Sequence, residues 1–462
     1  MTGRETVGGA AADFADRLGE LLARHRAPGA TLGILRDGEI SAVGAGVLST
    51  ATGVDVTADS VFQIGSITKV WTATLVMQLV DEGALELDQP VVELLPGFRV
   101  ADAEVTRTVT MRHLLTHTSG IDGDVFTDTG RGDDCLERYV TGLAEVEQNH
   151  PLGATWSYCN SGYVLAGRIV EHLTGSTWDA ALRERLVEPL ALTATVTLPE
   201  DALLHRTAVG HVGEPEDDPA PASTWMLPRS AGPAGLISAR VADVLAFARM
   251  HLAGGVVAGG ERVLSAASAA AMTAEEVRLP DTRTLGDSWG LGWIRYGWDA
   301  ERLLGHDGNT LGQAAFLRVL PSRGIAVALV ANGGHTLDLS RDLFGEVFAE
   351  LAGVGLPAPL APADDPVADD PAAYVGRYER AGLATEVVEG ADGLVLRSTI
   401  TGPLAALLPE PVHEYALAPI EPGVYAMRAP GTVTWIAVTF YALEDGARYV
   451  HYGARANPFL GD

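Results

Sequence analysis

The first part of the chain carries apolar residues at two different spacings. Residues 11–25 place apolar side chains three and four positions apart, which predicts an amphipathic helix. Two short apolar runs at 30–35 and 40–47, separated by an Asp-Gly turn, predict a β-hairpin. Helical spacing returns at 66–82 and then, as shorter patches between loops, across 85–250. The expected order is therefore a helix, a hairpin and a mostly helical middle.

The second part of the chain changes to a period of two. Four alternating runs between 289 and 331 predict successive antiparallel strands, and a closing helix is expected at 340–352. Residues 356–371 are rich in proline and aspartate without periodicity, which is typical of a linker. Short alternating runs over 372–462 predict a small antiparallel barrel or sandwich. We therefore expect a first domain over 1–355 and a separate β domain after the linker.

Composition and charge limit which classes of partner and cofactor can be expected. Apolar residues make up 47% and charged residues 20% of the 462 residues, so sizeable cores can form. The formal charge of -28 repels phosphate backbones and anionic lipids, so neither nucleic acid nor membrane is an expected partner. No signal peptide or membrane-spanning run is predicted, and we expect a cytoplasmic protein. Cys135 and Cys159 lack the ligand spacing of a metal site. His113 and His117 have the i, i+4 spacing of a metal pair but no third ligand in range, so no cofactor is expected.

Lys69 is the one lysine among 32 basic residues. Because an amine can lose its proton and a guanidinium effectively cannot, a lysine kept among arginines indicates a position that needs this property. Ser66 lies three residues earlier, on the same face of the predicted helix at a Cβ distance of about 5 to 6 Å. A neutral amine can activate a serine hydroxyl, provided that the lysine pKa falls by about three units. The alternative is a lysine with a solvated head and no role.

Tyr158-Cys159-Asn160 form a second candidate segment, where a loop meets a predicted helix that begins near residue 161. A phenol can accept or donate a proton during acyl transfer, and an amide can hold a carbonyl or an amine. Cys159 faces the other way in an extended triplet, so we interpret it as a small core residue and not as a nucleophile. Considered alone, Tyr158 is better explained as an ordinary half-buried tyrosine.

The third candidate segment, His306-Asp307-Gly308-Asn309, stands at the end of a predicted strand. The glycine would let a substrate approach the backbone closely. A following N–H group could complete an oxyanion hole, which stabilises the negative oxygen that forms during acyl transfer.

Taken in order, the patterns S-x-x-K, Y-x-N and H-x-G resemble the active-site elements of the penicillin-recognising serine enzymes. The resemblance is to the branch of class C β-lactamases, D-Ala-D-Ala carboxypeptidases and related esterases. The segments FQIGSITK, HLLTHTSGI and PAGLISARVADVLAFA support it, so that it covers about residues 10–352. It implies an α/β lobe, with an antiparallel sheet flanked by helices, beside an all-α lobe. The tail is similar in architecture to the lipocalin-like barrels of some members, including thioesterases of the penicillin-binding-protein type.

The resemblance also implies a role for each candidate. Ser66 would be the nucleophile and Lys69 its base partner, with Tyr158 as proton shuttle. Asn160 would be a substrate ligand and His306 the residue of the third element. The substrate and oxyanion site would comprise the Ser66 and Asn309 N–H groups together with Asp307 and Gly308.

One departure from the family pattern changes the expected substrate. Where β-lactamases carry Lys-Thr-Gly in the third element, this chain has His306-Asp307-Gly308. An aspartate about 4 Å from a substrate carboxylate would cost about 4 kcal/mol at an effective dielectric constant near 20. The exceptions would be an Asp307 turned away from the site, or Arg295 or Arg318 pointing into it. We therefore expect neutral acyl donors to be preferred.

The sequence thus predicts a serine acyl-transfer enzyme that forms an acyl-Ser66 intermediate on an ester, thioester or amide. Its partner would be a small-molecule or peptide acyl substrate, free or bound to a carrier protein, as in natural-product biosynthesis. One alternative is a D-Ala-D-Ala carboxypeptidase or class C-like β-lactamase. Another is a catalytically silent binding protein, which the retention of Lys69 disfavours.

Overall fold

The computed structural model describes residues 9–213, 217–366, 370–401, 405, 411–429 and 432–461. Within these residues an antiparallel sheet of eight strands has the order β2-β1-β12-β11-β10-β9-β8-β7. Its strands are β1 (Gly29–Arg36), β2 (Glu39–Gly46), β7 (Val277–Arg278), β8 (Ser288–Trp289), β9 (Ile294–Trp298), β10 (Glu301–Asn309), β11 (Ala314–Leu320) and β12 (Ile325–Ala331). The hairpin and the later strands are therefore where the sequence pattern predicts them, and the sheet combines both ends of the first domain.

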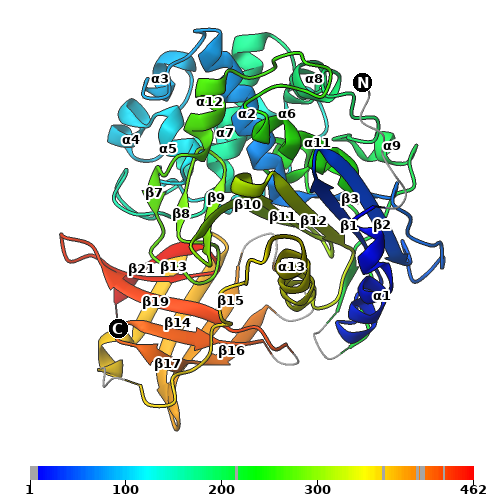
Figure 1. The fold of residues 1–462 in the computed structure, drawn as a ribbon. Coiled ribbons are helices and arrows are strands. Elements are labelled where there is room, and N and C mark those ends of the chain that lie inside the picture. The colour runs from blue at the N-terminus through cyan, green and yellow to red at the C-terminus, as the bar shows by residue number, and fades with distance from the viewer. Residues whose placement is uncertain are drawn as a thin grey trace.

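The sheet is covered on both faces, and β12 shows why. Every residue of β12 is buried, with successive side chains directed to opposite faces. Val327 and Leu329 pack with α1 (Ala15–Arg24) and α13 (Thr336–Ala352). Ala326, Ala328 and Val330 belong instead to the core shared with α11 (Val241–Leu252). Figure 1 shows α1 and α13 on one side of the sheet and the helical lobe on the other.

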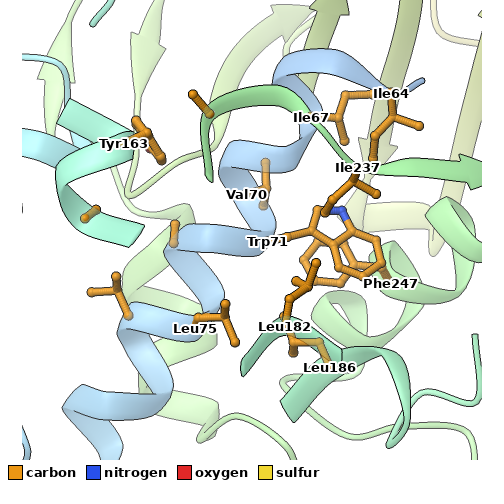
Figure 2. Close-up of a cluster of buried hydrophobic side chains, with 14 of the residues drawn as sticks. Ile64, Ile67, Val70, Trp71, Leu75, Tyr163, Leu182, Leu186, Ile237 and Phe247 are labelled. Carbon is orange, nitrogen blue, oxygen red and sulfur yellow. The ribbon is translucent and has the colours of Figure 1, made fainter. Parts of the chain in front are cut away.

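The helical lobe is built around α2 (Thr68–Asp81), whose side chains are buried from Thr68 to Leu79. Figure 2 shows Trp71 of this helix in a cluster of apolar side chains, stacked on Phe247 with ring centroids 3.9 Å apart. The other helices of the lobe are α3 (Val91–Leu94), α4 (Ala103–Thr108), α5 (Met111–Leu115), α6 (Cys135–Gly142), α7 (Asn160–Thr174), α8 (Trp178–Leu182), α9 (Pro199–Ala202), α10 (Gly232–Gly235) and α12 (Ala266–Thr273). Because α2 is buried on every side, it forms the centre of the helical lobe.

The start of α2 differs from the prediction. The helix begins at Thr68 and not at Ser66, because a short 3₁₀ turn, Gly65–Ile67, precedes it. Gly65 has φ +51°, a left-handed conformation that favours glycine and redirects the chain into the helix. The short pair β3 (Val61–Gln63) and β6 (Ser238–Arg240) leads into this turn. The closing helix likewise begins at Thr336, four residues before the predicted start.

The C-terminal region forms the predicted antiparallel β-barrel. Among the described residues, nine strands form a nearly closed sheet in the order β16-β15-β14-β13-β21-β20-β19-β18-β17. Its strands are β13 (Gly376–Arg380), β14 (Leu383–Gly390), β15 (Gly393–Ile400), β16 (Val412–Ala416), β17 (Ala418–Glu421), β18 (Val424–Met427), β19 (Ile436–Ala442), β20 (Arg448–Tyr452) and β21 (Arg455–Gly461). The barrel has a core of its own, which includes Tyr378, Leu396 and Val450.

The barrel packs against the first domain near α13 (Figure 1). Asp338 of α13 accepts hydrogen bonds from the N–H groups of Val433 and Thr434, at 3.1 and 2.9 Å. The Tyr441 hydroxyl lies 3.0 Å from that of Thr155, in the loop before α7. Three residues of the predicted linker, 367–369, lie outside the described residues, so the domain boundary stays a prediction. In the described part of the chain, no helix is long and apolar enough to cross a membrane.

Candidate active site

Ser66 and Lys69 meet at the start of α2, as their spacing predicts. The Lys69 amine lies 3.1 Å from the Ser66 hydroxyl. Ser66 belongs to the 3₁₀ turn and Lys69 to the first turn of the helix, so the Gly65 conformation sets the distance between them. Lys69 is completely buried, which is exceptional for a lysine side chain.

The other contacts of Lys69 define what its amine can do. Its Nζ lies 2.7 Å from Asn160 Oδ1 and 2.6 Å from the Ala234 carbonyl oxygen of α10. Both oxygens can only accept, so each takes one N–H. Burial lowers the lysine pKa well below its ordinary value, and the positive charge of Arg455 lowers it further. A neutral amine with both hydrogens donated directs its lone pair at the third contact, the Ser66 hydroxyl.

Tyr158 lies against this pair. Its ring centroid is 4.7 Å from Lys69 Nζ, and its side chain is buried. Burial raises the pKa of the phenol above its ordinary value, and the nearby Ser66 hydroxyl opposes this rise only in part. The phenol therefore keeps its proton at neutral pH and is able to donate it. Cys159 is buried as expected, and burial raises the pKa of its thiol to about 12.

Asn160 connects the lysine to a buried charge cluster that reaches into the barrel. The Asn160 amide nitrogen donates to Asp124 at 3.1 Å. Asp124 also pairs with Arg455 at 2.9 Å and with Arg380, both from the barrel. Burial raises the pKa of Asp124, but the two arginines outweigh it and hold that pKa at about 2. Asn160 is thereby fixed with its oxygen toward Lys69.

Two glycines bring the third segment against the nucleophile. A Cβ added at Gly308 would lie 1.9 Å from the Ile64 carbonyl oxygen and 2.9 Å from Ser66 N. One added at Gly65 would lie 2.6 Å from Asn309 N. Only residues without a side chain allow β10 to pass this close to the 3₁₀ turn. The backbone nitrogens of Ser66 and Asn309 thus lie on neighbouring segments, as an oxyanion hole requires.

His306 of β10 is buried and uncharged. Burial lowers its pKa to about 3. Its Nδ1 lies 2.6 Å from the Asp307 carbonyl oxygen, which can only accept, so Nδ1 carries the ring proton. The buried Nε2, which has no protein partner among the described residues, is then a free acceptor. Where β-lactamases place a lysine, this site offers a neutral ring.

The Asp307 carboxylate is not a free negative charge, as the expected repulsion of a substrate carboxylate assumes, because it forms an ion pair with Arg318. Both of its carboxylate oxygens accept from Arg318 on the neighbouring strand β11, one of them at 3.1 Å. The guanidinium of Arg318 also lies 4.1 Å from the centroid of the Tyr296 ring. Because this bidentate pair is nearly neutral, the predicted repulsion of a substrate carboxylate is largely cancelled. Arg295, the other arginine considered, bonds to Ser288 and to the Thr273 carbonyl instead.

A cavity of about 530 Å³ collects these groups between the helical lobe, the sheet and the barrel. Its polar lining includes Ser66, Tyr158, Asn160, His306, Asp307, Asn309 and Arg455. Its apolar lining includes Val125, Phe126, Val164, Leu227, Leu285, Leu337 and Ile436. Among the predicted site residues, Lys69 lies behind this surface and Gly308 lies against the backbone of Ser66. The structure therefore brings all of the predicted residues together around one mainly apolar cavity.

Sequence reasoning missed three residues at this site. Ala234 lies in the segment PAGLISAR, which the sequence marks without revealing that its carbonyl binds Lys69. Asp124 and Arg455 carry no motif and come from distant parts of the chain. The two histidines considered as metal ligands contact other groups. His113 Nδ1 lies 2.8 Å from the Thr110 hydroxyl. His117 Nδ1 accepts a hydrogen bond from the Cys159 N–H at 2.9 Å.

Comparison with known proteins agrees with this geometry. The family model described as beta-lactamase matches residues 14–350. "Penicillin-binding protein 4" of Amycolatopsis lactamdurans is 52% identical over 375 residues, which cover 81% of this chain and 98% of that protein. The crystal structure of SurE matches with a TM-score of 0.77 and 30% identity, over 97% of this chain and 100% of that one. The octameric penicillin-binding protein homologue from Pyrococcus abyssi shares the fold, with a TM-score of 0.63 at 22% identity over 97% of this chain and 99% of that one.

The match of the family model over most of the first domain, the 52% identical relative and the grouping of serine, lysine and tyrosine lead to one assignment. The chain belongs to the beta-lactamase family of serine hydrolases, whose fold it extends with a C-terminal β-barrel.

Proposed function

We propose that the protein is a serine acyl-transfer enzyme that forms an acyl-Ser66 intermediate on an ester, thioester or amide. The observation that carries the proposal is the hydrogen bonding of Lys69. Its two N–H groups are committed to Asn160 and Ala234, which leaves the lone pair for the Ser66 proton. A catalytically silent binding protein has no need of a buried neutral lysine, so this arrangement supports an enzyme.

The reaction follows from the positions of these groups. Ser66 Oγ attacks the acyl carbon while its proton passes to Lys69 Nζ. The Ser66 and Asn309 N–H groups stabilise the resulting oxyanion. When the intermediate collapses, the alcohol, thiol or amine leaves with a proton relayed from Lys69 through Tyr158, and the acyl group stays on Ser66. Water or an amine then attacks the acyl carbon, transfers its proton back by the same path and frees the serine.

Two observations support particular acyl donors. The cavity is mainly apolar apart from the catalytic groups, which suits an apolar acyl or peptidyl chain, free or bound to a carrier protein. The structure of SurE, 30% identical to this chain, is also known with D-Leu. We therefore include acyl donors that end in a D-amino acid among the substrates to test.

A second candidate is a D-Ala-D-Ala carboxypeptidase or a class C-like β-lactamase. It is favoured by the 52% identity to a protein named penicillin-binding protein 4. Neutralisation of Asp307 by Arg318 also removes the electrostatic objection to a substrate carboxylate. The missing lysine of the third element weighs against it, since the corresponding His306 carries no charge.

The test is intact-protein mass spectrometry after incubation with activated esters, D- and L-aminoacyl thioesters, and β-lactams. We expect a mass increase of one acyl group, lost in Ser66→Ala and strongly slowed in Lys69→Arg, because an arginine of similar length cannot accept the proton. Acylation of Lys69→Arg at the wild-type rate would contradict the role of Lys69. A penicillin as the fastest donor would establish the second candidate instead.

A further inference from the structure

His117 occupies a turn after α5 and holds the segment that carries Tyr158. Its backbone is left-handed, with φ +59°, and its side chain is fully buried. The His117 carbonyl accepts from the Ser157 N–H at 3.0 Å, and its Nδ1 accepts from the Cys159 N–H at 2.9 Å. These two bonds fall on either side of Tyr158 and fix the backbone on which its phenol is mounted.

The imidazole of His117 also fixes the phenol ring itself. The two rings stack with centroids 4.3 Å apart and planes 28° from parallel. Because Nδ1 accepts a hydrogen bond, the ring proton sits on Nε2, which is buried with no hydrogen-bond partner among the described residues. The edge of Trp289 closes this pocket at 4.9 Å. Burial lowers the His117 pKa well below its ordinary value, so the ring stays neutral.

Holding one backbone N–H does not require this residue. Asparagine or glycine tolerates a left-handed backbone at a lower conformational cost, and an asparagine oxygen can accept a hydrogen bond. The flat ring is the feature that neither replacement supplies. Stacking restricts the rotation of the Tyr158 side chain, which also contacts the Lys69 amine, the Arg455 guanidinium and the Trp289 ring.

We propose that His117 is a positioning residue for acyl transfer, which holds the Tyr158 phenol at the orientation from which it relays a proton between Lys69 and the leaving group. This inference rests on the proposed function. It assigns His117 to the catalytic machinery without contact with the substrate, and it predicts that the effect of His117 depends on the Tyr158 hydroxyl.

The test is a double-mutant cycle on the acylation rate constant, followed with phenyl butyrate by release of phenol, a leaving group that needs a proton at neutral pH. His117→Asn keeps an acceptor and tolerates the positive φ but loses the stacked ring. We expect it to slow acylation by about 100-fold, the scale of a misplaced catalytic group, with a smaller effect on KM. In a Tyr158→Phe background, the same change should slow acylation by less than about threefold. His113→Asn, which alters the other histidine of the same segment, is the matched control and should acylate near the wild-type rate.

An equal loss in the presence and absence of the Tyr158 hydroxyl would show that His117 supports the fold in general, and would overturn the inference. Wild-type acylation rates in His117→Asn would also overturn it. If His117→Asn does not fold, His117→Gly, which accepts the positive φ, takes its place in the cycle. Failure of the proposed function is distinguishable, since wild-type protein would then release no more phenol than Ser66→Ala.

Discussion

Lys69 shows how a single residue couples stability to activity. The fold places its amine in a fully buried position and keeps it neutral, although the same amine in an unfolded chain carries a proton at neutral pH. Folding therefore has to remove that proton, and this costs free energy whenever the solution favours the charged form. The state that lets Lys69 activate Ser66 is also the state that destabilises the native protein.

This linkage predicts a pH dependence of stability. Between the lowered folded pKa of Lys69 and the ordinary value near ~10.4, the unfolded chain binds one more proton than the native protein. The Lys69 contribution to the free energy of unfolding should therefore rise by about 1.4 kcal/mol per pH unit across that window. In thermal unfolding, the Tm of wild type should increase relative to that of Lys69→Met between about pH 7 and about pH 9. A constant difference in Tm would contradict a neutral buried lysine.

The acylation rate constant should also depend on the protonation state of Lys69, and it should be higher when the amine is neutral. The active form has Lys69 unprotonated, so the acylation rate constant should fall as the pH drops below the lowered Lys69 pKa and reach a plateau above it. His306 and Asp124, whose pKa values are held at about 3 and about 2, do not titrate in the neutral range. Measurement of single-turnover acylation against pH checks this expectation. A rate that is independent of pH down to the onset of acid unfolding would contradict it.

The pair formed by Asp307 and Arg318 determines how the site treats charged donors. Asp307 lines the cavity, and its replacement by asparagine leaves its buried partner Arg318 without a counter-ion. We expect the kcat/KM of a donor with a free carboxylate to rise by at least about tenfold relative to that of its neutral ester. Arg302→Gln is a suitable control, because it removes an ion pair from the same sheet at a more exposed position. An unchanged ratio in Asp307→Asn would show that Arg318 does not reach the donor.

At the scale of elements, the site depends on how closely β10 approaches the 3₁₀ turn before α2. Gly308→Ala would place a methyl group against the backbone of Ile64 and Ser66, where nothing flexible can move aside. We expect the two segments to separate and acylation to slow by about 100- to 1000-fold through the weakened oxyanion hole. Gly345→Ala, on α13 with no atom within 4 Å of the added methyl group, is the control. Normal acylation by folded Gly308→Ala would contradict this oxyanion hole.

The sequence predicted the elements well where the signal is local. Periodicity found both strands of the hairpin and the run of strands that contains β10, and the spacing of Ser66 and Lys69 placed them together. The start of α2 was wrong by two residues because a glycine conformation interrupts the helix. Asp124 and Arg455 were not predictable, since 331 positions separate them and their pairing depends on how the barrel docks. Local patterns do not encode such a contact.

At the scale of the whole molecule, the barrel forms part of the site. The Tyr158 N–H donates to the Ala454 carbonyl at 3.0 Å, and the Ala456 N–H donates to the Ser157 hydroxyl at 3.2 Å. Together with the pairing of Arg455 and Asp124, these bonds attach the turn between β20 and β21 to the segment before α7. A domain that the sequence presents as an appendage thus supplies one wall of the cavity.

Limited proteolysis tests both the predicted boundary and this attachment. We expect cleavage within 356–371, with fragments that remain together in size-exclusion chromatography because buried ion pairs and backbone hydrogen bonds join them. Asp124→Asn should weaken the association of the cleaved halves, since two buried arginines lose their shared counter-ion. Asp134→Asn, which removes only an exposed ion pair, is the control. Protection of the whole linker would contradict the predicted boundary. Separation of the cleaved wild-type halves would contradict the attachment of the barrel to the first domain.

The pairing of Asp124 with Arg455 also has a consequence for the order of events during synthesis. A ribosome adds about 5 to 20 residues per second, so the nucleophile at Ser66 is made roughly 20 to 80 s before Arg455. Until Arg455 is made, the Asp124 beside Asn160 lacks this counter-ion, and the cavity has no barrel wall. The nascent chain therefore holds its serine and lysine in an incomplete site until the strand that carries Arg455 is made, and we expect full reactivity only after the barrel has docked.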